Sequence, residues 1–312
     1  MQVCIIGSTG HTGYVVDGIE IDGEARIAGI APGSEGEDVK GLFNTIKSKL
    51  DQKPVVFNDY RKMLDTVKPD VAVVASYFKD HAPITLEVLK RDIHVFVEKP
   101  IATTFRDLNR IKEAYRKTDV NMAAMFGLRY TPWFLTTYHL VKNGVIGRVR
   151  LMNAQKSYKL GTRGEHYKKR EIYGGTIPWV GSHAIDWIQW YSNEKFKSVY
   201  ASHSSRYNKD HGELEMTGLV HFEMTDGVFA GVNIDYLRPE TASTHGDDRI
   251  RIAGTEGVLE VREGKVFLIN DTQEGIQEVS LDYSGQVFAD FLKEVRDEGT
   301  CLISAEDAIY VT

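Results

Sequence analysis

Cysteine is scarce in this chain: Cys4 and Cys301 are the only two among 312 residues. Two thiols exclude a disulfide framework and a cysteine-rich metal site, and the ten histidines include no His-x-x-x-His pair. We therefore expect no metal site and a cytoplasmic protein. No apolar run approaches the ~18 residues of a membrane span, and the first residues read as a strand instead of a signal peptide, so no membrane partner is expected.

An excess of positive charge is absent as well. The chain has 38 basic against 44 acidic side chains and a net charge of -6, so electrostatics give no reason to expect nucleic acid as a partner. A length of 312 residues, at roughly 100–200 residues per domain, predicts two domains. Repeats, low-complexity segments and flexible linkers are missing, so the two domains are expected to adjoin directly.

Strand and helix patterns alternate over the first 127 residues. Short apolar runs bounded by turn residues predict strands, and amphipathic segments between them predict helices. This alternation implies right-handed crossovers and therefore an α/β domain, residues 1–127, with a Rossmann-like doubly wound parallel sheet of six strands. The predicted strands are 3–6, 26–30, 54–57, 71–75, 94–97 and 121–126, and the predicted helices include 60–67, 79–91 and 105–117.

The first strand runs into the glycine-rich turn Gly7-Ser8-Thr9-Gly10-His11-Thr12-Gly13. Such a turn lets the free amides of a helix N-terminus approach a pyrophosphate. Thr9 stands where the usual dinucleotide fingerprint has a glycine, so a simple tight turn is the alternative. The residues expected to contact a dinucleotide are Gly7, Ser8, Thr9, Gly10, His11 and Thr12.

The choice of dinucleotide depends on the loop after the second strand. A fold that prefers NAD commonly has an acidic residue at this strand end, which binds the ribose hydroxyls. Here the chain reads Ala31-Pro32-Gly33-Ser34, so the expected acid is displaced or missing. No arginine stands in the loop to hold a 2′-phosphate, and Glu35, Glu37 and Asp38 would repel one. NAD is favoured, and NADP is left open.

The stretch His94-Val95-Phe96-Val97-Glu98-Lys99-Pro100 is a buried strand that stops at a charged pair. Proline biases Lys99 toward an extended backbone, at the carboxyl end of the strand. Parallel sheets bind ligands at that edge, where the strand 71–75 also ends, in Ser76. We expect Ser76, Glu98 and Lys99 in the cofactor site; the alternative is an ordinary strand end with a solvated Glu-Lys pair.

Beyond residue 127 the pattern changes to longer, adjoining strands. Thr225-Asp226-Gly227 and Thr255-Glu256-Gly257 are hairpin signals. Residues 128–312 are therefore expected to form an α+β substrate-binding and oligomerisation domain with a large, open, mostly antiparallel sheet. After a helix over 133–143, the predicted strands are 148–159, 198–207, 215–222, 228–236, 249–252, 258–261 and 266–269, and residues 305–312 read as the beginning of a longer helix.

Three separated segments carry a family resemblance. They are the N-terminal strand, turn and helix; Val97-Glu98-Lys99-Pro100-Ile101; and Phe126-Gly127-Leu128-Arg129-Tyr130-Thr131-Pro132. Together they resemble the family of glucose-fructose oxidoreductase, inositol dehydrogenase and the rhizopine-catabolism proteins (Gfo/Idh/MocA), which has an Arg-Tyr-x-Pro element at its domain junction. The resemblance implies an NAD(P)-dependent oxidoreductase acting on a secondary alcohol of a sugar, cyclitol or sugar derivative, with Arg129 and Tyr130 near the substrate.

The segment from Gly174 to Asp186 resembles the family's segment with two glycines, an Asp and, four residues later, a His that faces the nicotinamide. His183 falls on that His, but Trp179 stands in place of the Asp. The resemblance implies that His183 and Lys99 are catalytic; a core histidine is the alternative. Asp186 follows His183 by three residues on the same helical face and could take over part of the missing carboxylate's role.

Alcohol oxidation requires a proton to leave oxygen while a hydride leaves the same carbon. An imidazole with a pKa of about 6.5 can accept that proton, and a lysine ammonium can hydrogen-bond the developing alkoxide. Because an oxidised nicotinamide is cationic, it would lower the pKa of a neighbouring lysine. Which of Lys99 and His183 is the ultimate base is left open.

Aromatic and basic residues near these motifs allow two interpretations. Four aromatic residues are expected as apolar platforms for a sugar face, or as core residues: Tyr130, Tyr158, Trp179 and Tyr236. The basic segment 159–170 is expected to be a solvated charged loop; the alternative is a lid in which Arg163, His166 or Tyr167 touches the substrate.

Two other functions stay open. One is a non-catalytic regulator that binds a dinucleotide and a sugar, which the loss of the Asp to Trp179 favours. The other is a redox-neutral NAD-dependent glycosidase. In each case the expected partners are a small-molecule polyol or sugar and a second copy of the chain, as a homodimer or homotetramer. The exposed sheet face for that association is predicted to carry Leu219, His221, Val228, Ala230, Val232 and Ile234.

Overall fold

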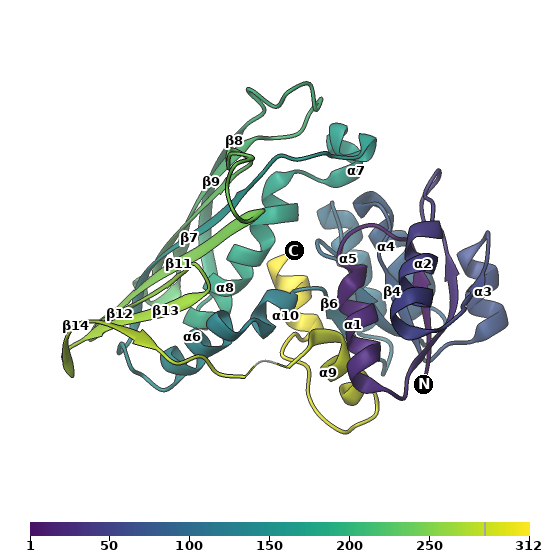
Figure 1. The fold of residues 1–312 in the computed structure, drawn as a ribbon, viewed down its shortest axis with the longest axis horizontal. Helices are drawn as coiled ribbons and strands as arrows, with labels where there is room; N and C mark the ends of the chain where they lie inside the picture. The colour runs from purple at the N-terminus through teal and green to yellow at the C-terminus, as the bar shows by residue number, and fades with distance from the viewer. Residues whose placement is uncertain (284) are drawn as a thin grey trace.

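Two sheets organise the chain (Figure 1). The computed structural model describes residues 1–283 and 285–312. The first sheet has six strands in the order β3-β2-β1-β4-β5-β6, and the second has eight in the order β14-β13-β12-β11-β7-β10-β9-β8. The predicted fold class is confirmed. Among residues 1–283 and 285–312, no helix is long and apolar enough to cross a membrane.

The first sheet is parallel throughout. Its central strands are buried on both faces, which explains why they read as unbroken apolar runs. The strand order reverses between β1 and β4, so their carboxyl ends open a crevice in which doubly wound folds bind ligands. The strands are β1 Gln2–Ile6, β2 Arg26–Ala31, β3 Val55–Val56, β4 Val71–Val74, β5 His94–Val97 and β6 Met122–Ala124.

The helices of this domain lie on both faces of the sheet (Figure 1). They are α1 Thr12–Asp22, α2 Lys40–Leu50, α3 Tyr60–Val67, α4 Phe78–Leu89 and α5 Phe105–Tyr115. The sequence analysis missed α2, because only Leu42 and Ile46 are buried in a segment rich in lysine. The third strand is shorter than predicted: it is an exposed edge strand of two residues that follows Pro54, which has no N–H to donate.

The second sheet is antiparallel except for the pair β7–β10 among the described strands. Helices α6 (Pro132–Lys142) and α8 (Ser182–Ser192) cover its inner face. Four of the six residues predicted for the exposed face are buried, so placing them there was wrong: Val228, Ala230, Val232 and Ile234. Leu219 and His221 are exposed, as predicted. The strands are β7 Val149–Tyr158, β8 Phe196–Ser204, β9 Thr217–Met224, β10 Phe229–Asp235, β11 Gly246–Gly254, β12 Gly257–Arg262, β13 Lys265–Asn270 and the unpredicted β14 Gln273–Val279.

The end of the chain returns to the first domain. Helices α9 (Val287–Val295) and α10 (Ala305–Val311) join the core of the parallel sheet. The ring of Phe288 lies 4.9 Å from that of Phe96 on β5, and a side chain at Gly18 of α1 would put its Cβ 2.7 Å from the Cβ of Phe288. The predicted boundary at residue 127 therefore does not separate the two cores, since residues 287–311 complete the first one.

Candidate active site

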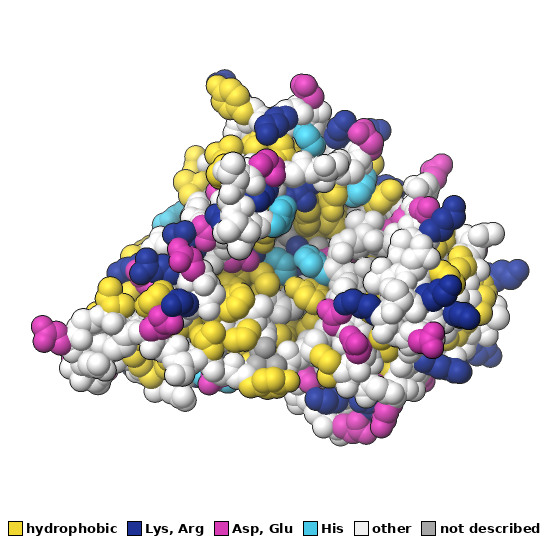
Figure 2. Space-filling model, viewed as in Figure 1, with side chains coloured by type: hydrophobic (Ala, Val, Ile, Leu, Met, Phe, Trp, Pro, Cys, Tyr) yellow, Lys and Arg dark blue, Asp and Glu magenta, His cyan; other side chains and the backbone are white. Residues whose placement is uncertain are grey.

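A cavity of about 300 Å³ lies between the two domains. Figure 2 shows a hollow there, with histidine side chains gathered in it. The cavity brings together the predicted residues Lys99, Tyr158, Trp179 and His183, which come from the end of β5, from β7, from a π-helical turn (Ile177–Gly181) and from α8. Its other lining residues are Gly10, His11, Arg163, Tyr167, Val180, Tyr236 and His245.

The glycine turn presents an open helix end beside this cavity. Gly7 has a φ of +93°, and a side chain there would put its Cβ 2.4 Å from the carbonyl oxygen of Ala75 after β4. The N–H groups of Thr12 and Gly13, in the first turn of α1, have no acceptor among the described residues. A Cβ on Gly13 would meet nothing within 4 Å. The turn therefore fits the pyrophosphate of a dinucleotide, which takes amide donors at a helix N-terminus.

Two carboxylates rest on this turn. Glu98 accepts a hydrogen bond from the His11 amide at 2.6 Å and lies 2.8 Å from its Nδ1. Burial alone would raise the pKa of Glu98, but the charge and hydrogen bonds of His11, with the charge of Lys99, lower it to about 2. Glu98 is therefore ionised and holds the turn against the end of β5.

The second carboxylate is Glu37, whose role the sequence analysis missed. Glu37 accepts hydrogen bonds from Ser8 N at 2.9 Å and Thr9 Oγ1 at 3.0 Å, and from Gly33 N and Ser34 N at 3.1 Å each. No acidic residue stands at the end of β2. An acidic side chain six residues further along the chain reaches the glycine turn instead, because the loop folds back onto it. The acidic composition of that loop was the only signal in the sequence.

Ser76 lies beneath the turn instead of inside the cavity. It is fully buried, and its hydroxyl donates to the carbonyl of Ile6 at 3.3 Å. A Cβ on Gly7 or Gly33 would collide with this hydroxyl. Ser76 therefore supports the turn from below.

Lys99 joins the two domains. Its Nζ is buried and donates a hydrogen bond to the backbone carbonyl of Trp179 at 2.8 Å. Burial lowers the pKa of Lys99 to about 8, with the charge of Glu98 opposing the shift and the charge of Lys156 adding to it. A lysine with such a pKa can give and take a proton near neutral pH.

His183 is buried on α8 with its ring edge-on to His11 and Phe126, at centroid distances of 5.8 and 5.7 Å. Its Nδ1 has no hydrogen-bond partner among the described residues. Burial holds the pKa of His183 well below its usual value, and the positive charges of Lys99 and Lys156 lower it further. His183 is therefore a neutral imidazole at pH 7.

A buried ion pair supports this arrangement from β7 and β11. Lys156 Nζ lies 2.6 Å from Asp248 Oδ2 and above the ring of Trp187, 4.8 Å from its centroid. The sequence analysis did not single out Lys156. The two-residue period of β7, with Ala154 also on the inner face, is the signal that could have found it.

Arg129 and Tyr130 do not line the cavity, so the predicted substrate contacts do not fit their positions. Arg129 is buried in an ion pair with Asp186, with 2.9 Å from Nε to Oδ2, and its NH1 donates to Leu302 O and Asp307. The Tyr130 hydroxyl accepts from Leu302 N at 2.8 Å. Asp186 hydrogen-bonds to Arg129 and, among the described residues, makes no hydrogen bond to His183, so it does not support the histidine as expected. These residues fasten α8 and α10 to the domain junction.

The basic segment 159–170 borders the cavity through Arg163 and Tyr167. Residues 161, 162, 164, 165, 169 and 170 are exposed, as predicted for a solvated loop, whereas the contacts of Arg163, His166 and Tyr167 support the lid interpretation. The guanidinium of Arg163 lies over the rings of Trp179 and Tyr236, at 5.4 and 4.9 Å. Tyr167 stacks on Trp179 at 4.3 Å, and His166 stacks on Tyr77 of the first domain at 4.5 Å. The segment therefore contacts both domains.

Comparison with known families matches both parts of the chain. Residues 3–126 match the family described as oxidoreductase family, NAD-binding Rossmann fold, and residues 134–260 match the GFO/IDH/MocA C-terminal domain. A Thermotoga maritima protein of known structure, provisionally named an oxidoreductase, is 51% identical with a TM-score of 0.96, covering 100% of this chain and 94% of that one.

Two curated relatives carry functional names. Inositol 2-dehydrogenase of Salmonella typhimurium is 28% identical over 144 residues, which is 46% of this chain and 41% of that protein. Glycosyl hydrolase family 109 protein 1 of Akkermansia muciniphila is 28% identical over 180 residues, 55% of this chain and 35% of that protein. The match thus spans less than half the length of each.

Because Tyr167 stacks on Trp179, we expect the ordered position of the lid to depend on the Trp179 ring. Trp179→Ala should lower stability by about 3 kcal/mol and should speed amide hydrogen exchange in residues 163–168. Trp190→Ala is the matched control: this ring is equally buried and stacks on Tyr138 at 4.2 Å, away from the lid. It should cost similar stability and leave lid exchange unchanged. Unchanged lid exchange in Trp179→Ala would contradict the assignment.

Proposed function

Because the chain belongs to the GFO/IDH/MocA oxidoreductase family, we propose that it is an NAD-dependent dehydrogenase acting on a secondary alcohol of a sugar, cyclitol or related polyol. The observation that carries the proposal is the convergence of Lys99 and His183, from different domains, on one cavity beside the open end of α1. A bound nicotinamide supplies the hydride acceptor or donor. The side chains of the cavity then have to accept the proton during oxidation and donate it during reduction.

Lys99 is the group that takes this proton during alcohol oxidation. A general base works best when its pKa is near the operating pH, and burial brings the pKa of Lys99 to about 8. The neutral amine accepts the proton at Nζ, and the resulting ammonium is held by the carbonyl of Trp179. In the reverse reaction the same ammonium donates the proton to the alkoxide.

His183 orients the hydroxyl and does not keep the proton. An imidazolium at this position would be buried beside the positive charges of Lys99 and Lys156, and for this reason its pKa is held well below the usual value. A neutral imidazole has one donor and one acceptor nitrogen, which suits a substrate hydroxyl that must be held in one orientation.

The walls of the cavity favour an uncharged polyol. Tyr158, Trp179 and Tyr236 supply apolar ring faces of the kind that pack on the C–H face of a sugar. The hydroxyl of Tyr236 is buried without a partner among the described residues, so it is free for a substrate hydroxyl. The guanidinium of Arg163 lies over the rings of Trp179 and Tyr236, and its Nε, which has no partner among the described residues, can donate to a further substrate oxygen.

A redox-neutral glycosidase is the second candidate. The observation that favours it is the match to a protein named as a glycosyl hydrolase of family 109. Such an enzyme would use the same Lys99 and His183 but return the hydride within one turnover. Release of a sugar from a glycoside without net cofactor reduction would select this candidate.

Self-association is proposed through the outer face of the second sheet. Phe229 and Leu151 lie opposite each other on β10 and β7, and Leu219 lies on the neighbouring β9. All three are exposed, as is Tyr200 on β8. Phe229 and Leu151 are adjacent, and Leu219 and Tyr200 lie elsewhere on the same sheet. Exposed apolar side chains that gather on one face mark interaction surfaces, and the same face on a second copy would cover them.

Replacement of the two proposed catalytic residues should separate their roles. Lys99→Ala and His183→Ala should each lower kcat by at least about 100-fold on whichever polyol a substrate screen finds, with NAD affinity nearly unchanged. In the wild type, kcat/KM for oxidation should rise with pH to an inflection near 8, as Lys99 loses its proton. The inflection should persist in His183→Ala and vanish in Lys99→Ala. Full activity in His183→Ala would refute the mechanism.

Glu37 should set the preference for NAD. Its carboxylate lies on the turn and would repel a 2′-phosphate, so Glu37→Gln should raise the affinity ratio of NADPH to NADH by about tenfold or more. Titration of both cofactors by calorimetry measures this ratio. Glu35→Gln, an exposed neighbour in the same loop, is the control and should leave the ratio unchanged. If Glu37→Gln behaves like that control, Glu37 does not select the cofactor.

The outer sheet face gives a test of assembly. Light scattering should show a dimer or tetramer for the wild type and mainly monomer for the double variant Leu151→Asp, Phe229→Asp. Both side chains are exposed, so the fold should tolerate the change. Phe105→Asp, on α5 and also exposed, should not alter the assembly. A monomeric wild type at micromolar concentration would speak against the proposed interface.

A further inference from the structure

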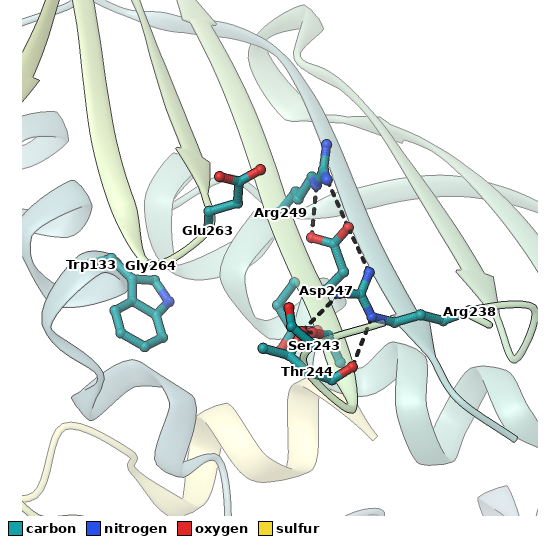
Figure 3. Close-up of a pocket in the computed structure, with 10 residues that line it drawn as sticks. Trp133, Arg238, Ser243, Thr244, Asp247, Arg249, Glu263 and Gly264 are labelled. Atoms are coloured by element: carbon teal, nitrogen blue, oxygen red, sulfur yellow. Dashed lines mark hydrogen bonds and ion pairs between the residues drawn. The ribbon is translucent and has the colours of Figure 1, made fainter. Parts of the chain in front are cut away.

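A second, larger cavity of about 930 Å³ lies next to the first one, in the sheet domain (Figure 3). It is lined by residues of four segments: Trp133 at the start of α6, Arg238 and Thr244 in the loop before β11, Asp247 and Arg249 on β11, and Glu263 in the turn after β12. We propose that this cavity is a second sugar subsite, which binds the neighbouring unit of a glycoside whose reacting ring occupies the active cavity. The inference rests on the proposed function.

The two cavities approach each other at the beginning of β11, where consecutive residues line one and then the other. His245 lines the active cavity, and the next residue, Gly246, lines the second. The ring of Tyr158 stands at this point: it lies 5.4 Å from the His245 ring, and a side chain at Gly246 would put its Cβ 2.7 Å from Tyr158 Cε1. The Tyr158 ring therefore separates the two cavities, and two linked sugar rings, one in each cavity, would have their linkage at this ring.

Trp133 provides an aromatic wall. It lies across open space from Ser243 and Thr244 in Figure 3, with Glu263 and Arg249 on the sheet side. Gly264, which also lines the cavity, lies beside the ring, because a Cβ there would be 3.5 Å from Trp133 Cζ3. An indole that lines a cavity can stack on the apolar face of a sugar ring.

The polar side chains around this ring are fixed in place. Asp247 accepts two hydrogen bonds from Arg249 at 2.7 Å each, and Arg238 lies 3.4 Å away from it. Arg238 also donates to the backbone and hydroxyl oxygens of Thr244, at 3.0 and 2.8 Å. Donors and acceptors held this way do not need to be ordered when a ligand binds, which reduces the entropy cost of binding.

The charge of the lining decides between ligand classes. Arg238 and Arg249 face Asp247, Asp248 and Glu263, and Asp248 is in turn paired with the buried Lys156. No positive excess remains to attract a phosphate or a uronate. The carboxylate of Glu263 has no hydrogen-bond or ion-pair partner among residues 1–283 and 285–312, so it can accept hydrogen bonds from hydroxyl groups of an uncharged sugar.

Binding of matched sugars tests the proposal. The NADH-loaded protein is titrated by calorimetry with glucose, myo-inositol and a panel of glucosyl disaccharides (cellobiose, maltose, trehalose and sucrose). At least one disaccharide should bind about tenfold more tightly than glucose, and Trp133→Ala should remove most of that advantage without weakening the binding of the single-ring ligands. Glu263→Gln should remove part of it. Phe105→Ala, an exposed aromatic outside both cavities, should change nothing.

Each other outcome counts against the subsite in a distinguishable way. If single-ring sugars bind and no disaccharide binds more tightly, the second subsite is wrong and the proposed function stands. If Trp133→Ala weakens glucose and disaccharides equally, Trp133 supports the fold and the subsite is also wrong; Glu263→Gln, on an exposed turn, checks this without disturbing the core. If no sugar or cyclitol binds at all, both the subsite and the proposed function fall.

Discussion

One hydrogen bond, from the Lys99 ammonium to the backbone carbonyl of Trp179, determines how the active cavity is built. It crosses the domain interface, and it takes place in a region from which water is excluded, so it is stronger than the same bond at a surface. It also places the Trp179 ring where the lid packs on it. A main-chain oxygen therefore binds the lysine, and the Trp179 side chain is free to pack against Tyr167.

Several buried ionisable side chains lie on helix α8 or against it. His183, Asp186 and Trp187 lie within one turn of it and face His11, Arg129 and Lys156, respectively. Each cation is either paired or lies over a ring, since an isolated buried charge would be very costly. The unpaired member of the group is the neutral His183. Burial is the main reason why the pKa of His183 is low and the imidazole is uncharged, and the positive charges of Lys99 and Lys156 lower that pKa further.

Local patterns of the sequence predict the parallel sheet well. Strands β1, β4 and β5 are buried on both faces and lie in continuous apolar runs, and Lys99 ends one of them at the edge where ligands bind. Features that depend on distant contacts were not predictable. Glu37 reaches the glycine turn only because its loop folds back. Arg129 does not lie at the expected substrate site, because it pairs with Asp186 and Asp307, which follow it by 57 and 178 residues in the chain. Helix α2 was missed because it buries little.

The return of α9 and α10 to the first domain has a consequence for the order of synthesis. On the ribosome, the strands of the parallel sheet are made first, but Phe288 and Phe291, which pack against β5, follow almost two hundred residues later than Phe96. Domains usually fold as units and in order from the N-terminus. In this chain the Rossmann-like core stays incomplete during translation of the whole sheet domain, so the apolar surface that α9 and α10 cover remains open until residues 287–311 have emerged.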